Sequence, residues 1–507
     1  MLAALSAVGS AWVQPQIDWH ALAPELIVVV TIVIALLVDL GSSEGSKWTV
    51  SSIAGIGLLA AMIPVISLAT DDVTRSMFGG AYVVDDFALL LKALFLIAGY
   101  LTILLSTNYV AEGDYYEGEY YVLLLSSVLG MMMMASSRDL ISIFVALEML
   151  SIPAYLLASW RKRTQTGIEA GMKYYLMGVF ATAVMLYGMS LIYGGTGSTL
   201  LTEIGHGLNG SFGDKPIAVV GIVFTLVGFA FKISAVPFHN WAPDTYEGAP
   251  TPITAFLSVA SKSAGFVAIL ELIYVGFYGR TDTIRPLMFV LAVLTMTVGN
   301  VIALRQTNIV RLFAYSSVAQ AGFILAPLAV VGTGGLGTAH KILSSIVMYL
   351  IVYTVMNLGA FAVIITVSRW ITSGEIKDWG GLFTYAPGLA VAMGVFLFGL
   401  GGIPPAAGWF AKFQLFGSVL SAGTTAAYIM AVVMAVNSVI SLAYYLNVMR
   451  TMFMDDVPDG DLTPIKIPVP LGAAVGLAFC ATMVVGIVPG TVADLANGAT
   501  LAFLPGR

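Results

Sequence analysis

The sequence has little charge and almost no cysteine. Only 10% of its 507 residues are Asp, Glu, Lys or Arg, whereas soluble domains carry about 25%. Its one cysteine, Cys480, excludes a disulfide framework and any cluster held by cysteine ligands of this chain. The four histidines are scattered and lack the spacing of metal ligands. The composition therefore excludes a large soluble domain, and any redox cofactor must sit in other chains.

Apolar stretches fill most of the chain instead, and hydrophobic residues make up 59% of it. At about 20 apolar residues per crossing, we count about fourteen spans. They begin near residues 24, 49, 86, 120, 139, 169, 216, 250, 286, 308, 343, 387, 425 and 468. We therefore expect an all-α membrane protein that is surrounded by lipid and has no nucleic-acid partner.

The loops give an expected orientation. The chain starts without a basic n-region, so we expect no signal peptide and a first span that stays in the mature protein. An even number of crossings places both termini on one side. On the side of the membrane opposite the termini, the loops hold ten basic residues, including Lys47. On the side of the termini they hold six, including Arg138 and Arg507. The positive-inside rule then favours periplasmic termini.

The sequence also repeats itself weakly, at an offset of 168 to 169 residues. RDLISIFVALEMLSIPAYLLA resembles TNIVRLFAYSSVAQAGFILA, which pairs Asp139 with Asn308, and Trp241 falls opposite Trp409. With five spans per unit, an odd number, consecutive copies must have opposite topology. We therefore expect two inverted five-helix repeats, formed by spans 4–8 and spans 9–13.

This plan divides the chain into four parts. Residues 1–119 would hold the first three spans, and residues 120–280 the first repeat. Residues 281–455 would hold the second repeat, and residues 456–507 the last span and a C-terminal tail.

Each repeat contains a span that prolines interrupt. Pro237, Pro243 and Pro250 break the seventh span, and Pro404 and Pro405 break the twelfth. A helix broken at membrane depth leaves carbonyls that only water, protein or polar side chains can satisfy. The two discontinuous helices therefore mark expected hydrated pockets. The alternative is that these prolines end one span and form an ordinary loop before the next.

Four charged residues lie in the apolar spans: Glu148, Lys232, Lys262 and Lys412. A charge at the bilayer centre costs several kcal/mol unless it is paired or hydrated, so such residues usually line an ion path. Apolar residues flank Lys232 and Lys262 on both sides, which prevents them from reaching water by extension. Glu148 near Lys232 would hold the lysine charged, and separation would release its proton. The pattern predicts proton movement.

Two further residues have two explanations each. Lys173 follows Glu169 by four residues, which predicts a simple ion pair on one helix face, but Lys173 would also fit an inward position beside Glu148. His239 lies in the seventh-span break, where it would relay protons or only make a hydrogen bond.

Three other charged residues have a simpler interpretation. Lys92 and Glu271 lie near the ends of spans, and Lys341 opens a span. This placement predicts anchoring at the membrane interface for all three.

Several motifs together carry a family resemblance: EMLSIPAYLLASW, FKISAVPFHNWAPDTYEGAPTPITAFLSV, NIVRLFAYSSVAQAGFIL and GIPPAAGWFAKF. They closely resemble subunit N of the bacterial proton-pumping NADH-quinone oxidoreductase, respiratory complex I, over about residues 85–455. The resemblance implies fourteen transmembrane helices, two inverted repeats, and discontinuous seventh and twelfth helices.

The resemblance also implies roles for the charged residues. Glu148 would modulate Lys232, protons would pass through Lys262, and Lys412 would deliver them towards the far side. Lys173 matches an extra lysine of the sixth helix in this family.

As a member of this family, the chain would be a non-redox subunit of a proton-translocating enzyme in the bacterial inner membrane. It would conduct protons while quinone is reduced elsewhere in the complex. NADH, FMN, iron-sulfur clusters and quinone would bind partner subunits, and the antiporter-like subunit M and the small subunit K would be its neighbours.

Other functions remain open at this point. The chain would also fit a stand-alone antiporter that exchanges sodium for protons, or a subunit of a multi-subunit cation/proton antiporter or of a related membrane-bound dehydrogenase or hydrogenase. As a scaffold, its buried charges would only pair with neighbouring subunits. Lysine at position 412, where subunit M and the antiporters usually have glutamate, favours subunit N. A length of 507 residues also leaves no room for the long C-terminal extension that is usual in subunit L. Sodium ions prefer carboxylate oxygens as ligands, and the row of mostly lysine residues lacks them. In a scaffold, burying lysines without a countercharge would cost much free energy.

Overall fold

The computed structural model describes residues 16–41, 48–112, 117–371, 373–458, 460–499 and 501. In this part of the chain, twelve helices are long and apolar enough to cross a membrane. Two shorter apolar helices, α8 (Pro216–Lys232) and α16 (Pro387–Gly401), form the first halves of the broken seventh and twelfth spans. The predicted all-α membrane fold is thereby confirmed. Lys47 and Arg507, which entered the orientation count, lie outside the described residues.

The first three spans are α1 (Trp19–Gly41), α2 (Trp48–Asp71) and α3 (Asp86–Glu112). An antiparallel hairpin of β1 (Arg75–Met77) and β2 (Tyr82–Val84), with the short helix η3 (Phe78–Gly80) between them, joins α2 to α3. Arg75 binds Asp18 and Asp71, each at 2.7 Å, and its hydrogen bond lowers the pKa of Asp18 below the usual value. This ion network fixes the hairpin to the start of α1.

The first repeat contains spans 4 to 8. Spans 4 to 6 are α4 (Glu117–Ser136), α5 (Leu140–Ala158) and α6 (Gln165–Thr196), followed by the short α7 (Leu201–Leu208). The seventh span is α8 and, after the break, α9 (Trp241–Gly248). The eighth is α10 (Thr251–Phe256), the π-helical turn η4 (Leu257–Ser261), α11 (Lys262–Glu271) and the π-helical turn η5 (Leu272–Gly276).

The second repeat contains spans 9 to 13. They are α12 (Thr281–Ala303), α13 (Ile309–Leu325) with η7 (Ala326–Val330), α14 (Gly335–Ser368), the broken α16 and α17 (Gly408–Leu420), and α18 (Thr425–Met454). The short elements η6 (Tyr278–Arg280), η8 (Ile376–Trp379) and α15 (Leu382–Tyr385) lie in the connections. The last span is α19 (Val469–Ile487), and α20 (Gly490–Gly498) follows it.

The repeat predicted from Asp139 and Asn308 is visible in the backbone. Asp139 caps α5 by accepting hydrogen bonds from the amides two and three residues ahead, at 2.8 and 3.1 Å. Asn308 caps α13 in the same way, at 2.9 and 3.2 Å. Each cap also forms an isolated antiparallel bridge, Asp139 with Leu200 and Asn308 with Glu375. The sequence pairing therefore corresponds to equivalent positions in two copies of one unit.

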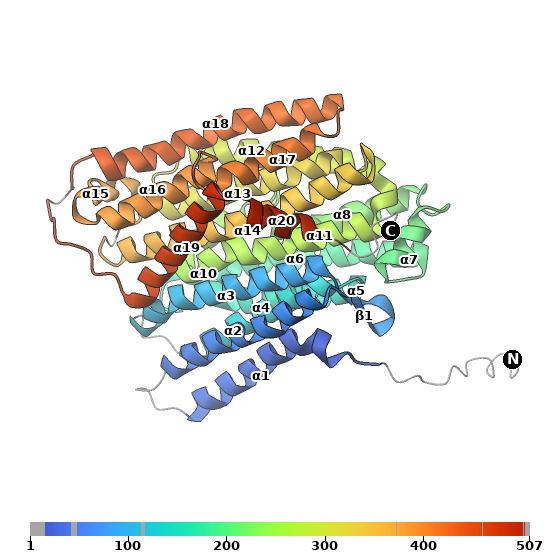
Figure 1. Ribbon diagram of the computed structural model, residues 1–507, viewed down its shortest axis with the longest axis horizontal. Helices are drawn as coiled ribbons and strands as arrows, with labels where there is room; N and C mark the ends of the chain where they lie inside the picture. Colours follow the sequence, from blue (N-terminus) through green and yellow to red (C-terminus); the bar gives the residue numbers. More distant parts are fainter. Residues whose placement is uncertain are drawn as a thin grey trace, which may run out of the picture.

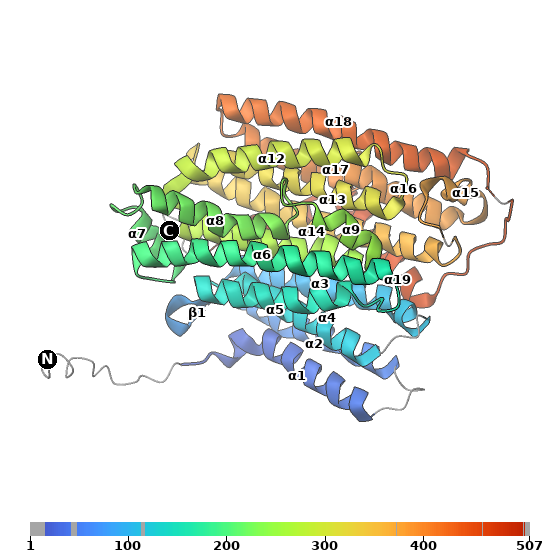
Figure 2. The same ribbon diagram turned by 180° about the vertical axis from the view of Figure 1, so that it is seen from behind.

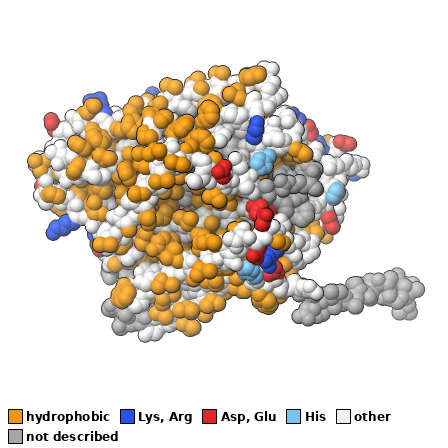
Figure 3. Space-filling view, viewed as in Figure 1, with side chains coloured by type: hydrophobic (Ala, Val, Ile, Leu, Met, Phe, Trp, Pro, Cys, Tyr) orange, Lys and Arg blue, Asp and Glu red, His pale blue; other side chains and the backbone are white. Residues whose placement is uncertain are grey.

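The helices lie roughly side by side, with α1 and α2 at one edge of the bundle and α18 at the opposite edge (Figures 1 and 2). In the eighth span, the whole apolar 18-residue stretch is buried inside the protein. In the corresponding stretches of α1 and α19, only 33% and 28% of the residues are buried. The surface exposed by the outer helices is apolar: Figure 3 shows hydrophobic side chains spread over most of one face, with few charged ones among them. The eighth span is therefore the centre of the protein, and lipid or partner helices cover the outside.

Some expected positions of charged residues are wrong. Lys92 and Glu271 do not reach out of the protein to anchor it at the membrane interface, because both side chains are fully buried. Arg138 lies in the loop between α4 and α5, as expected, but it is only 1% exposed. Lys341 does not open its span, since α14 begins at Gly335, but its side chain is exposed.

Candidate functional site

Lys232 is the last residue of α8, where the seventh span breaks. Its side chain is 2% exposed, and Nζ donates hydrogen bonds to Ser151 Oγ at 2.9 Å and to Tyr174 OH at 3.0 Å. Trp241, from the far side of the break, donates its indole N–H to the Phe231 carbonyl at 3.0 Å. The break therefore places a lysine among neutral hydroxyls, which can bind the ammonium without fixing its charge.

Glu148 lies on α5, three residues before Ser151 and on the same helix face. Its side chain is half-buried, and Oε1 is enclosed without a hydrogen-bond partner. Among the described residues, no carboxylate oxygen lies within 4.0 Å of Lys232 Nζ. Glu148 thus forms no ion pair with Lys232, and Ser151, which Lys232 binds, lies on the same face of α5 as Glu148.

Lys262 is the first residue of α11, immediately after the π-helical turn η4. Its side chain is 2% exposed, and Nζ donates to the Ser317 carbonyl at 2.8 Å and to the Ser317 hydroxyl. Ser317 belongs to α13, so Lys262 connects the first repeat to the second. The buried hydroxyls of Tyr246 and Tyr353 lie next to Ser317.

Lys412 lies in α17, the second half of the twelfth span, and is 5% exposed. Its Nζ donates to the Leu400 carbonyl at 2.9 Å and to the Gly401 carbonyl at 3.1 Å, the last carbonyls of α16. It also lies 4.7 Å from the centre of the Phe323 ring. The predicted free carbonyls of the break exist, and a lysine from the other half-helix satisfies them. Because Lys232 ends the first half of its span and Lys412 lies in the second half, the two approach their breaks from different ends, as predicted.

Polar side chains of α13 connect Lys262 to Lys412. Gln320, three residues after Ser317, donates to the same Leu400 carbonyl at 3.1 Å and to Tyr445 OH at 3.2 Å. Tyr349 in turn donates to the Gln320 side-chain oxygen. Sequence reasoning missed Ser317, Gln320, Tyr349 and Tyr445. Polar residues three apart within an apolar span were the available signal.

We call the buried Lys232, Lys262 and Lys412 the lysine row. Lys173 and His239 lie outside it. Lys173 is 41% exposed and pairs with Glu169 at 2.7 Å, which confirms the predicted pair, and with Asp244 at 2.6 Å. Asp244 also accepts a hydrogen bond from Arg311 of α13 at 3.1 Å. His239 lies in the seventh-span break with Nδ1 buried and unpartnered. Lys232, Lys262 and Lys412 therefore lie in the core, whereas Lys173 lies at the surface.

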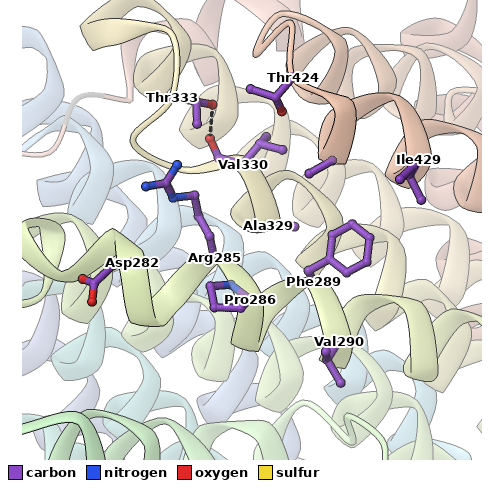
Figure 4. A pocket seen from close by; sticks show the side chains of 11 residues that line it. Asp282, Arg285, Pro286, Phe289, Val290, Ala329, Val330, Thr333, Thr424 and Ile429 are labelled. Carbon is purple, nitrogen blue, oxygen red and sulfur yellow. Dashed lines mark hydrogen bonds between the residues drawn. The ribbon is translucent and has the colours of Figure 1, made fainter. Parts of the chain in front are cut away.

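The described residues contain no group of three or more His, Cys, Asp and Glu side chains that could hold a metal. A groove of about 560 Å³ lies between α12, η7 and α18, lined by Arg285, Phe289, Val330 and Ile429 among others (Figure 4). None of the buried lysines lines it. The groove belongs to the outer surface and is separate from the lysine row.

Two broken spans in inverted repeats, each with a buried lysine, define an antiporter-like membrane protein. The NADH:quinone oxidoreductase/Mrp antiporter transmembrane family matches residues 137–441. NADH-quinone oxidoreductase subunit N of Trichlorobacter lovleyi is 40% identical over 492 residues, which cover 95% of this chain and 97% of that protein. NAD(P)H-quinone oxidoreductase subunit 2 of a Synechococcus strain is 40% identical over 493 residues, which cover 95% of this chain and 91% of that protein.

A solved structure agrees with these relatives. A chain of respiratory complex I from Thermus thermophilus with bound aureothin is 31% identical and superposes with a TM-score of 0.77, covering 94% of this chain and all of that one. The chain therefore belongs to the family of NADH-quinone oxidoreductase subunit N, a multi-pass membrane subunit of respiratory complex I. The predicted resemblance is confirmed, and it distinguishes subunit N from the other antiporter-like subunits.

Proposed function

We propose that this chain carries protons across the bacterial membrane, coupled to the reduction of quinone elsewhere in the complex. The observation that supports this function most directly is the set of partners of Lys232, Lys262 and Lys412. Each ammonium group has neutral oxygen partners, and among the described residues none has a carboxylate oxygen within 4.0 Å. A lysine fixed by a carboxylate stays charged, whereas a buried lysine among neutral groups can lose its proton.

The proposed path uses the charges in order. Glu148 raises the affinity of Lys232 for a proton, and Lys262 holds the proton at the centre of the protein. Ser317 and Gln320 connect Lys262 to Lys412, which passes the proton towards the far side. Each transfer needs water or a hydroxyl group as a bridge, because the lysines themselves do not touch.

Lys173 and His239 have supporting roles in this proposal. Lys173 forms an ion pair at the surface with Asp244, which belongs to α9, the second half of the broken seventh span. His239 lies in the break itself. Both positions suit the entry of protons into the seventh-span break.

The remaining parts of the function belong to partners. We expect NADH, FMN, iron-sulfur clusters and quinone in other subunits, and the antiporter-like subunit M and the small subunit K beside this chain. We also expect the bacterial inner membrane as its location, with both termini on the periplasmic side. Copurification followed by identification of the partner chains tests this assignment, and a stable, active monomer would contradict it.

Replacement of Lys262 tests the proton path. Lys262→Met keeps the length of the side chain but removes the proton site, and Lys262→Arg keeps a charge that is very hard to release. We expect both complexes to assemble and to lose proton pumping, measured in sealed vesicles beside quinone reduction. Lys341→Met, which removes an exposed lysine, is the matched control. Normal pumping by Lys262→Arg would show that Lys262 is a fixed charge and would remove the proposal.

A further inference from the structure

Three charged residues outside the lysine row meet in the interior: Asp85, Arg138 and Glu271. Arg138 Nη1 donates to Glu271 Oε1 at 2.6 Å, and Nη2 donates to Asp85 Oδ2 at 3.0 Å. None of the three side chains is more than 2% exposed. Asp85 directly precedes α3, Arg138 lies between α4 and α5, and Glu271 ends α11. This triad therefore joins the start of α3 to the loop between α4 and α5 and to the eighth span.

The charges of the triad do not balance. Two carboxylates and one guanidinium carry a net charge of −1 if all three are ionised. Within 4.0 Å of Glu271, the described residues place a single cation, Arg138. A net charge in the interior of a membrane protein costs several kcal/mol, and one proton on the triad removes that cost.

The surroundings decide which carboxylate takes this proton. Asp85 accepts the Ala88 amide hydrogen at 2.9 Å and sits at the start of α3, where the helix dipole stabilises an anion. Glu271 lies in the last turn of α11, where the dipole has the opposite effect, and its Oε2 is buried without a partner. The proton therefore belongs on Glu271 Oε2.

We propose that Glu271 is a proton-binding residue of the translocation path, held by Arg138 and Asp85, at the end of the eighth span. This inference rests on the proposed function. In the transfer, the O–H bond of Glu271 breaks, the proton passes to water, and the electron pair stays on the carboxylate that Arg138 holds. The next proton restores the neutral triad.

The position of Glu271 gives it a place relative to the lysine row. It follows Lys262 by nine residues of α11, which is a rise of about 13.5 Å and about two and a half turns. Glu271 therefore faces away from Ser317, towards α3 and α4, and lies nearer the end of the span where β2 leads into α3. A π-helical turn adjoins each of the two residues, and such turns are frequent at functional sites. Glu271 therefore lies between the centre of the protein and the membrane surface at which β2 leads into α3.

Infrared spectroscopy of the intact complex tests the protonation state. A protonated, buried carboxylic acid gives a C=O band that a carboxylate lacks. We expect Glu271→Gln to remove this band. Asp85→Asn should remove it too, although Glu271 is still present, because Arg138 then balances Glu271 alone. A band that survives Glu271→Gln, or one that survives Asp85→Asn, would overturn the shared-proton arrangement.

Pumping tests the role in translocation. We expect Glu271→Gln to lower the number of protons pumped per quinone reduced in an assembled complex. The double variant Glu25→Gln/Lys92→Met removes another buried ion pair, outside the repeats, and should keep the normal ratio. A normal ratio in Glu271→Gln together with a loss in Lys262→Arg would overturn this inference alone. A normal ratio in both variants would overturn the proposed function as well.

Discussion

Lys412 and Gln320 share one acceptor, the carbonyl of Leu400, at 2.9 and 3.1 Å. This carbonyl lies at the end of α16, where the helix breaks and no amide of the same helix can reach it. A lysine from one half of the broken span and a glutamine from α13 replace the missing donors. The residues at the Lys412 end of the proposed path therefore also donate the hydrogen bonds that stabilise the break in the twelfth span.

Lys412→Gln separates these two roles. Glutamine can still donate a hydrogen bond to a carbonyl, but it has no titrating proton. We expect the Gln variant to assemble normally and to lose proton pumping, measured in sealed vesicles beside quinone reduction. Lys412→Met should lose pumping and also lower the stability, by about 1–3 kcal/mol, because the carbonyls remain unpaired. Normal pumping by Lys412→Gln would reduce Lys412 to a structural donor.

Glu148→Gln tests the electrostatic control of Lys232. The substitution keeps the shape and removes the negative charge, so the proton on Lys232 becomes easier to lose. We expect an assembled complex in which quinone reduction and pumping slow down together, because coupled steps fall together. Glu169→Gln, which removes a 55% exposed carboxylate, is the control and should have no such effect. Full pumping by an assembled Glu148→Gln complex would take Glu148 out of the mechanism.

Gly265 makes room for Lys232 beside the eighth span. A β-carbon at this position would lie 2.9 Å from Ile233 Cγ2 and 3.3 Å from Lys232 Cγ. Gly265→Ala should therefore push Lys232 away from Ser151 and Tyr174, at a cost of about 1–3 kcal/mol, and reduce pumping. Gly417→Ala is the matched control, since a β-carbon there would meet no atom within 4 Å. Equal pumping rates in the two variants would show that the position of Lys232 is not critical.

The spans, the breaks and the buried lysines were predictable because their signals are local. A run of apolar residues, a proline pair at 404 and 405, or a lone lysine such as Lys262 can be recognised without knowing what packs against it. The weak repeat added Asp139 and Asn308, and both proved to be helix caps at equivalent positions. Local patterns thus accounted for the fold and for the candidate proton carriers.

The partners of these residues were not predictable, because helix packing selects them. Ser317 is 55 residues from Lys262, and its spacing from Gln320 marks a polar face without showing that Lys262 packs against it. Glu271 was misplaced for the same reason: its partner Arg138 is 133 residues away. A position near the end of a span suggests that a charged residue lies at the membrane interface. Only the helix packing shows whether its charge faces water or a countercharge.

The misplaced Lys92 allows a test of this distinction between fixed and mobile charges. Lys92 Nζ lies 2.8 Å from Glu25 Oε1 and donates to Tyr82 OH at 3.0 Å, with the lysine fully buried. Because a carboxylate holds it, we expect this lysine to join α1 to α3 and not to carry protons. Lys92→Met should lower stability by about 3–5 kcal/mol, since it leaves Glu25 buried and unpaired. The double variant Glu25→Gln/Lys92→Met should recover most of that loss, because no uncompensated charge remains. The melting temperature of the detergent-solubilised complex measures both effects, and the pumping ratio of the double variant should stay normal. A double variant that melts normally but no longer pumps would place the first three spans in the proton path.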